Sequence, residues 1–275
     1  MKVWISVDME GIAGVNHPGP TDLTHARYPA MVDLMVGETN AAIEGALAGG
    51  ATDVLVNDSH GSMFNLLPAA THPAARVIGG QKVWSMLAGA GPDAGVDVAL
   101  FVGYHARAGH PTGTIAHTYS GRPVETRLAG RPTGEYGLNA VALGGWGVPV
   151  GLVAGDDALA AEVAGWLPWA ERIVVKEAVG NSAAASLHPT IACDLIRAGA
   201  ERAVRRAAAG ELSLLEVGPP VVIEVDYARG IHADYAALIP GAERIGDRGV
   251  RFSFEDPVTA YRAFLAANRL AGIVE

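Results

Sequence analysis

Four short segments of the chain share one pattern: each is a nearly continuous apolar run that ends abruptly in polar residues. The runs cover residues 3–7, 53–56, 98–102 and 148–153. They are rich in β-branched residues and lack the strict alternation of a half-exposed strand, which is typical of strands covered on both faces of a sheet. We therefore expect four buried strands at the centre of the fold.

Helical patterns lie between these runs. Apolar residues at helical spacing extend from Met31 to Gly49, and shorter helical patterns cover residues 137–144 and 159–167. Strands that alternate with helices predict an α/β fold with a doubly wound, mostly parallel sheet flanked by helices. Ligands bind such sheets beyond the carboxyl ends of the strands. The polar residues after the four runs are therefore expected to lie together.

The pattern changes after about residue 180. A long helix is expected over residues 187–209, followed by a strand over 221–225, a half-exposed strand over 250–254 and a final helix after Asp256-Pro257. We interpret this part as a smaller α+β portion beside the main sheet. The predicted domains are an α/β domain over residues 1–180, which carries the four strand ends, and a smaller α+β domain over residues 181–275.

Composition narrows the class of protein. A net charge of −9 argues against nucleic-acid binding, which usually needs a basic face. No apolar run is long enough to span a bilayer, and the first residues lack the pattern of a signal peptide, so we expect a cytoplasmic protein with no membrane partner. Cys193 is the only cysteine, which excludes an internal disulfide and cysteine-rich zinc sites.

The first strand ends in two carboxylates, Asp8 and Glu10, within the segment Ser6-Val7-Asp8-Met9-Glu10-Gly11. Residues two apart in an extended segment project to the same side. Two neighbouring anions are costly unless a positive group lies between them, so the pair favours a cation site. The alternative is that both are solvated or pair with Lys or Arg.

Three further residues extend this candidate metal site. His60 follows the second run, His105 follows the third, and Glu135 begins a helix, where it is also suited to the helix dipole. A catalytic zinc ion normally takes three protein ligands, so five ligands exceed the needs of one ion. With one bridging carboxylate they supply three contacts to each of two metal ions, and Asp8 is the expected bridge.

His117 has no place in this ligand set. It lies in Ile115-Ala116-His117-Thr118, after a loop that contains glycine. A loop histidine beside a metal site can act as a general base, a proton shuttle or a nucleophile at neutral pH. The alternative is an ordinary surface histidine.

Five motifs give the chain a specific resemblance to the bacterial D-aminopeptidase family. They occur in the order of that family and are Ser6-Val7-Asp8-Met9-Glu10-Gly11, Val56-Asn57-Asp58-Ser59-His60, Gly103-Tyr104-His105-Ala106-Arg107-Ala108, Ala116-His117-Thr118 and Gly134-Glu135-Tyr136-Gly137-Leu138-Asn139-Ala140. The resemblance implies a dinuclear zinc peptidase, with two zinc ions per subunit, that removes an N-terminal residue from short peptides and prefers D-amino acids such as D-alanine.

The resemblance also implies roles for individual residues. The metal ligands of the family fall on Asp8, Glu10, His60, His105 and Glu135, and its catalytic histidine falls on His117. It further implies a homo-oligomer, a ring of ten subunits whose sites face an internal channel. Residues 119–130 depart from the family pattern in length and content, and we expect this loop to shape the substrate pocket.

Two other functions compete with the D-aminopeptidase hypothesis. The same two metal ions would suit an amidase or esterase acting on another small carbonyl substrate. A protein without enzymatic activity, in which the ligands only hold a structural metal for assembly, is the third possibility. Closed structural sites rarely use so many carboxylates, which favours an enzyme.

Overall fold

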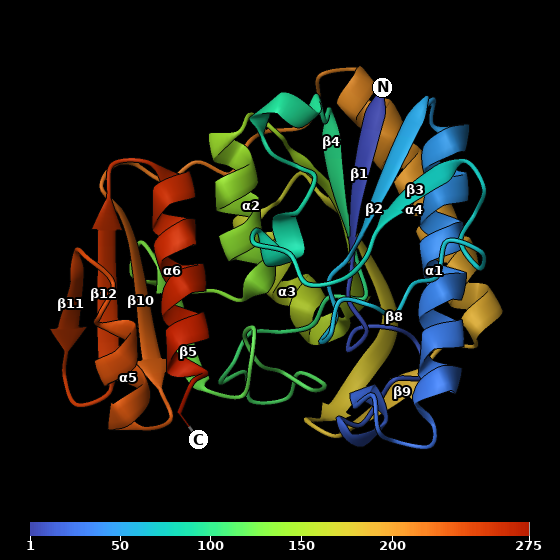
Figure 1. The fold of residues 1–275 in the computed structure, drawn as a ribbon. Helices are drawn as coiled ribbons and strands as arrows, with labels where there is room; N and C mark the ends of the chain where they lie inside the picture. The colour runs from blue at the N-terminus through green and yellow to red at the C-terminus, as the bar shows by residue number, and fades with distance from the viewer. Residues whose placement is uncertain (275) are drawn as a thin grey trace.

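A seven-stranded sheet forms the centre of the protein in the computed structural model, which describes residues 1–274 (Figure 1). The strands lie in the order β3 (Ala75–Ile78), β2 (Asp53–Asp58), β1 (Lys2–Val7), β4 (Val98–Val102), β7 (Val150–Asp156), β8 (Glu171–Gly180) and β9 (Ala183–Ser186). All neighbours are parallel except β8 and β9, which are antiparallel. The predicted α/β fold with a mostly parallel sheet is confirmed.

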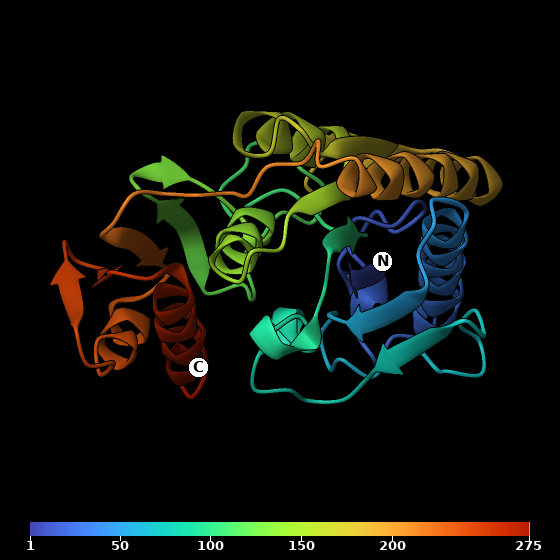
Figure 2. The same cartoon turned by 90° about the horizontal axis from the view of Figure 1, so that it is seen from above.

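Helices cover both faces of this sheet (Figure 2). One face carries α1 (Tyr28–Ala48) and α4 (Pro189–Ala208), and the other carries α2 (Glu135–Gly145) and α3 (Asp157–Trp166). Along β1, Val3 and Ile5 pack on the side of α1 and α4, whereas Trp4 packs on the side of α2. Because both faces are buried, the strand is apolar at nearly every position.

A second, antiparallel sheet lies beside the first, in the order β11 (Ala242–Ile245), β12 (Gly249–Phe254), β10 (Val221–Tyr227), β5 (Pro123–Leu128) and β6 (Arg131–Pro132). The helices α5 (Gly230–Ala236) and α6 (Pro257–Ala271) pack against it, and α6 also contacts α2. Figure 1 shows α2 between the two sheets.

The two sheets do not divide the chain at residue 180. Strands β5 and β6 precede residue 180 but belong to the second sheet, while α4 follows it and packs on the main sheet. The division into domains over residues 1–180 and 181–275 remains a prediction. Within the part of the chain that the structure describes, no helix is long and apolar enough to cross a membrane.

Helices α1 and α4 approach closely because small residues line their contact. A Cβ atom at Gly45 would lie 2.1 Å from the carbonyl oxygen of Arg197 and 2.8 Å from Cβ of Ala200. Gly45 therefore sets the distance between the two helices that cover one face of the sheet.

We expect Gly45→Ala to lower the free energy of unfolding by about 1–3 kcal/mol, because the added methyl group overpacks the contact. The control is Gly165→Ala in α3, an exposed position whose Cβ would meet only Nη2 of Arg131 at 3.7 Å. There the gain in helix propensity should raise stability by up to about 1 kcal/mol. Urea denaturation measures both values, and equal effects would contradict this account of the contact.

Candidate metal centre

The three carboxylates of the predicted site lie at the carboxyl end of the main sheet and are almost fully buried. Asp8 directly follows β1, its backbone N–H donates to the carbonyl oxygen of Val102 on β4 at 2.9 Å, and Glu10 comes two residues later. Glu135 is the first residue of α2. The exposed fractions are 4%, 6% and 3% for Asp8, Glu10 and Glu135. Such burial of three acidic groups requires compensation by positive charge.

The histidines of the predicted site face these carboxylates. Nδ1 of His60 lies 3.2 Å from Oδ1 of Asp8 and 2.9 Å from Oε2 of Glu10. Nε2 of His105 lies 3.5 Å from Oδ2 of Asp8 and 3.4 Å from Oε1 of Glu135. Asp8 is thus the carboxylate shared by the His60 side and the His105 side of the cluster.

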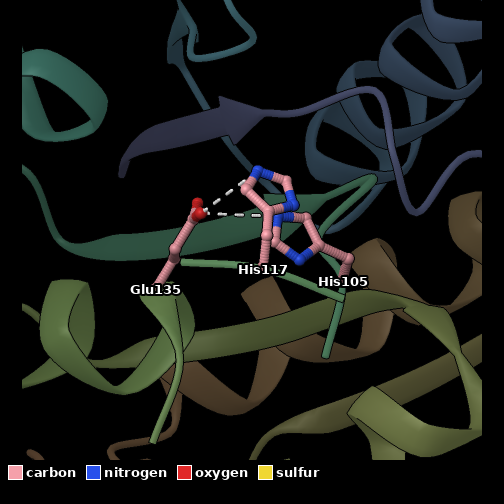
Figure 3. Close-up of side chains that lie close together, drawn as sticks. All are labelled: His105, His117 and Glu135. Atoms are coloured by element: carbon pink, nitrogen blue, oxygen red, sulfur yellow. Dashed lines mark ion pairs between the residues drawn. The ribbon is translucent and has the colours of Figure 1, made fainter. Parts of the chain in front are cut away.

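His117 joins the cluster from the loop between β4 and β5. Its ring stacks on that of His105, with centroids 4.0 Å apart and an interplanar angle of 10°. Its Nε2 lies 3.8 Å from Oε1 of Glu135, the same oxygen that faces His105 (Figure 3). The His117 side chain is 27% exposed, so it is the most accessible member of the cluster.

Each of the three rings is oriented by a backbone carbonyl. Nε2 of His60 lies 3.0 Å from the oxygen of Thr21, Nδ1 of His105 lies 2.9 Å from that of Ala106, and Nδ1 of His117 lies 2.9 Å from that of Ile115. A carbonyl oxygen only accepts, so each of these nitrogens carries a proton. In the neutral tautomer the other nitrogen of each ring then directs a lone pair at the carboxylates, which is the arrangement of metal-binding histidines.

The pKa values of Asp8, His60 and His105 are shifted by the charges that these groups bring together. Burial opposes ionisation of Asp8, but the imidazoles of His105 and His60 outweigh it and hold the Asp8 pKa well below its usual value. Burial also lowers the pKa of His60 and His105, yet the charges of Glu10, Glu135 and Asp8 raise both values well above normal. Protons on these rings therefore supply the positive charge when no metal ion does so, and metal binding would displace them.

Two groups of ligand atoms lie close enough together to hold a metal ion. One joins Asp8, Glu10 and His105, the other joins His105, His117 and Glu135, and the atoms of each group lie within 4.8 Å of one another. His60 is in neither group, although its Nδ1 contacts Asp8 and Glu10 directly. Nε2 of His105 is buried without a hydrogen-bond partner among residues 1–274, which a metal ion between the two groups would explain.

A cleft of about 400 Å³ gives access to the cluster. One wall comes from the main sheet and includes Asp8, Glu10 and His60. The opposite wall comes from α6 and residues near it, including Asn268, Arg269 and Ile273. Tyr119, Ser120 and Arg122, from the loop predicted to shape the pocket, complete the lining, whereas residues 123–128 form strand β5 of the second sheet.

The backbone around His117 is held in an unusual conformation. Ile115 and Tyr119 both have positive φ, 52° and 60°, which is uncommon for any residue with a side chain and especially for a β-branched one. Ile115 N–H donates to the oxygen of Asn181 at 2.7 Å, and Tyr119 N–H donates to Oε1 of Glu135 at 2.5 Å. The loop is thus pinned on both sides of His117, as strained functional segments usually are.

Asp156, the last residue of β7, makes hydrogen bonds with both of its carboxylate oxygens. It caps α3 by accepting from Leu159 N–H at 2.8 Å, and its second oxygen accepts from Thr114 N–H at 2.8 Å. The second bond ties the segment before His117 to the end of β7. The Asp58 carboxylate accepts hydrogen bonds from Asn65 and Leu66. Within residues 1–274 it forms no hydrogen bond with a ring nitrogen of His60.

Two buried charged residues near the site are not predicted from the sequence. Lys176, on β8, is 1% exposed, and its Nζ donates to the carbonyl oxygens of Glu10 at 2.5 Å, of Ile12 at 3.1 Å and of Val15. Glu38, on α1, accepts from Ala13 N–H at 2.8 Å. Together they fix the loop that carries Glu10.

Burial lowers the pKa of Lys176 to about 8 despite the nearby charges of Asp156 and Glu38. The ammonium group is therefore still largely protonated at neutral pH. Strand β8 mixes charged and apolar residues, so nothing in its pattern marks Lys176 as buried. Only the position of β8 next to β7 brings it under the loop.

Fold and site together define an α/β protein with a candidate metal centre in a cleft at the carboxyl end of its parallel sheet. Residues 1–266 match the profile of peptidase family M55, described as D-aminopeptidase, and the chain belongs to this family. It is therefore a peptidase of the D-aminopeptidase class.

Two known proteins are similar to it over nearly their whole length. A D-aminopeptidase of Bacillus subtilis (strain 168) is 36% identical over 275 residues, 98% of each chain. A solved structure of the Zn-dependent D-aminopeptidase DppA from Bacillus subtilis, described as a self-compartmentalizing protease, superimposes with a TM-score of 0.91 at 35% sequence identity. The match covers 99% of this chain and 98% of the DppA chain.

We expect Lys176→Met to weaken binding of a divalent metal ion by roughly tenfold or more, because the loop carrying Glu10 loses the donor that fixes it. Competition with a chelator measures the dissociation constant. The control is Lys2→Met, which also removes an ammonium bound to a carbonyl oxygen, that of Ala94, far from the cluster. If Lys176→Met lowers stability but leaves the affinity for the metal ion unchanged, Lys176 does not position the site.

Proposed function

We propose that the chain is a zinc-dependent aminopeptidase that removes an N-terminal D-amino acid, of the D-alanine type, from short peptides. The main structural support is the cluster, in which backbone carbonyl groups orient three imidazoles toward three buried carboxylates. Membership of family M55 and the relative described as Zn-dependent support the choice of reaction and metal.

We propose that Asp8, Glu10, His60, His105 and Glu135 would hold two zinc ions, with Asp8 placed between the His60 side and the His105 side of the set. In support, Asp8 faces His60 with one oxygen and His105 with the other. Three carboxylates nearly balance two divalent ions. Bound in this way, the ions supply Lewis-acid polarisation of the scissile carbonyl group.

His117 is the proposed catalytic residue. Its Nδ1–H is fixed on Ile115, so Nε2 is free to accept a proton in the cleft. In the proposed reaction a water molecule attacks the peptide carbonyl carbon, Nε2 takes the proton of the water, and the C–N bond breaks as Nε2 returns the proton to the leaving amine. Direct attack by Nε2 is the alternative role, and a covalent acyl group on His117, detected by mass spectrometry, would identify it.

The small volume of the cleft, about 400 Å³, favours short peptides. We also propose that the chain forms a homo-oligomer, a ring of ten subunits, consistent with the self-compartmentalizing relative. The mass of the protein in solution tests this assembly.

Zinc-loaded protein is expected to release alanine from D-Ala-D-Ala faster than from L-Ala-L-Ala. His117→Ala should lower kcat on the D peptide by roughly 100-fold or more, because the general base is lost, while the zinc content stays unchanged. His72→Ala, remote from the cleft, is the control. Amino-acid release and metal analysis are the two measurements.

Three results would count against this function. Hydrolysis of an amide or ester panel without hydrolysis of any di- or tripeptide would favour the amidase or esterase hypothesis. Full activity of His117→Ala would remove its catalytic role. Loss of zinc in His117→Ala would make it a ligand instead, as its grouping with His105 and Glu135 allows.

A further inference from the structure

A second cavity lies directly beside the catalytic cleft. Its volume is about 880 Å³, and it runs between the segment of residues 81–85 and helix α6 with the neighbouring second sheet. We call it the side groove and define it by Lys82, Trp84, Ile239, Phe254, Arg262 and Arg269. Ser85, Leu265 and Arg269 line both the cleft and the side groove, so the two cavities adjoin along these residues.

The side groove carries positive charge. Lys82, Arg262 and Arg269 line it, and none of its lining residues is acidic. Among residues 1–274, neither Arg262 nor Arg269 forms an ion pair with a carboxylate within 4.0 Å. Nζ of Lys82 donates to the carbonyl oxygen of Asp58 at 2.5 Å, and the charge of the Asp58 carboxylate also acts on it, so the two arginines are the groups best placed to bind an anion.

The walls of the side groove are apolar and aromatic. The guanidinium of Arg262 lies 5.6 Å from the centroid of Trp84, whose ring meets Trp146 edge-on at 5.1 Å. Ile239 and Phe254 close the side of the second sheet. Apolar walls with a few fixed polar groups are the usual features of a ligand site.

We infer that the side groove binds the carboxyl-terminal part of the peptide substrate, with its free carboxylate on Arg262 and an apolar side chain against Trp84 and Phe254. The inference rests on the proposed aminopeptidase function. An aminopeptidase holds the amino end of its substrate at the catalytic cluster, so the rest of the peptide must extend away from the carboxylates. The side groove offers the adjoining space and the complementary charge.

The test compares D-Ala-D-Ala with D-Ala-Gly-Gly-Phe, the latter with either a free carboxylate or a C-terminal amide. For the intact chain, kcat/KM for the tetrapeptide acid should exceed that for the amide by about tenfold, the usual strength of a charge-assisted hydrogen bond. Arg262→Gln should abolish this ratio. Arg248→Gln, an exposed arginine on the turn between β11 and β12, is the control and should keep it.

A binding measurement separates this inference from the proposed function. Isothermal titration of the metal-free chain with Gly-Gly-Phe should show tighter binding of the acid than of the amide, and Arg262→Gln should remove the difference. If D-Ala-D-Ala is cleaved but acid and amide are treated alike, the side groove is not a substrate site. If no peptide is cleaved, the proposed function fails and the titration alone decides the inference: a preference for the acid that Arg262→Gln removes supports it, and equal binding overturns it.

Discussion

The structure depends on one electrostatic constraint: three buried carboxylates lie against imidazole nitrogens whose lone pairs point toward them. Asp8, Glu10 and Glu135 are almost fully buried, and the carbonyl oxygens of Thr21, Ala106 and Ile115 fix which nitrogen of each ring faces inward. Carboxylates and lone pairs repel unless positive charge lies between them. Burial lowers the pKa values of His60 and His105, but the nearby carboxylates raise both well above normal, so protons compete with a metal ion for these nitrogens.

The rest of the fold holds this arrangement in place. Parallel pairing of β1 with β2 and β4 brings the segments that carry Asp8, His60 and His105 to one edge of the sheet. Lys176 and Glu38 fix the loop of Glu10 from beneath. On the far side, partly buried hydrogen bonds link the loop of His117 to α2 and α6: the Tyr119 hydroxyl donates to Asn139 at 2.7 Å and contacts the Tyr261 hydroxyl at 2.5 Å.

The main sheet and the residues of the candidate site could be predicted from the sequence. Strands buried on both faces are continuously apolar, and the polar residues after them lie at the edge of the sheet. The features that were not predicted depend on tertiary contacts. Strand β8 is too rich in charge to be recognised, so Lys176 is not predicted. Strand β5 is assigned to a loop, since only pairing with β10 makes it a strand. Asn268 and Arg269 belong to the cleft because α6 packs on α2, which no local pattern indicates.

The most direct test of the proposed dinuclear centre is anomalous X-ray scattering at the zinc absorption edge from crystals of the zinc-loaded protein. We predict two peaks per subunit, both in contact with Asp8, and with Glu10, His60, His105 and Glu135 distributed between them. A single peak, or no peak beside Asp8, would contradict the dinuclear centre and the mechanism proposed from it.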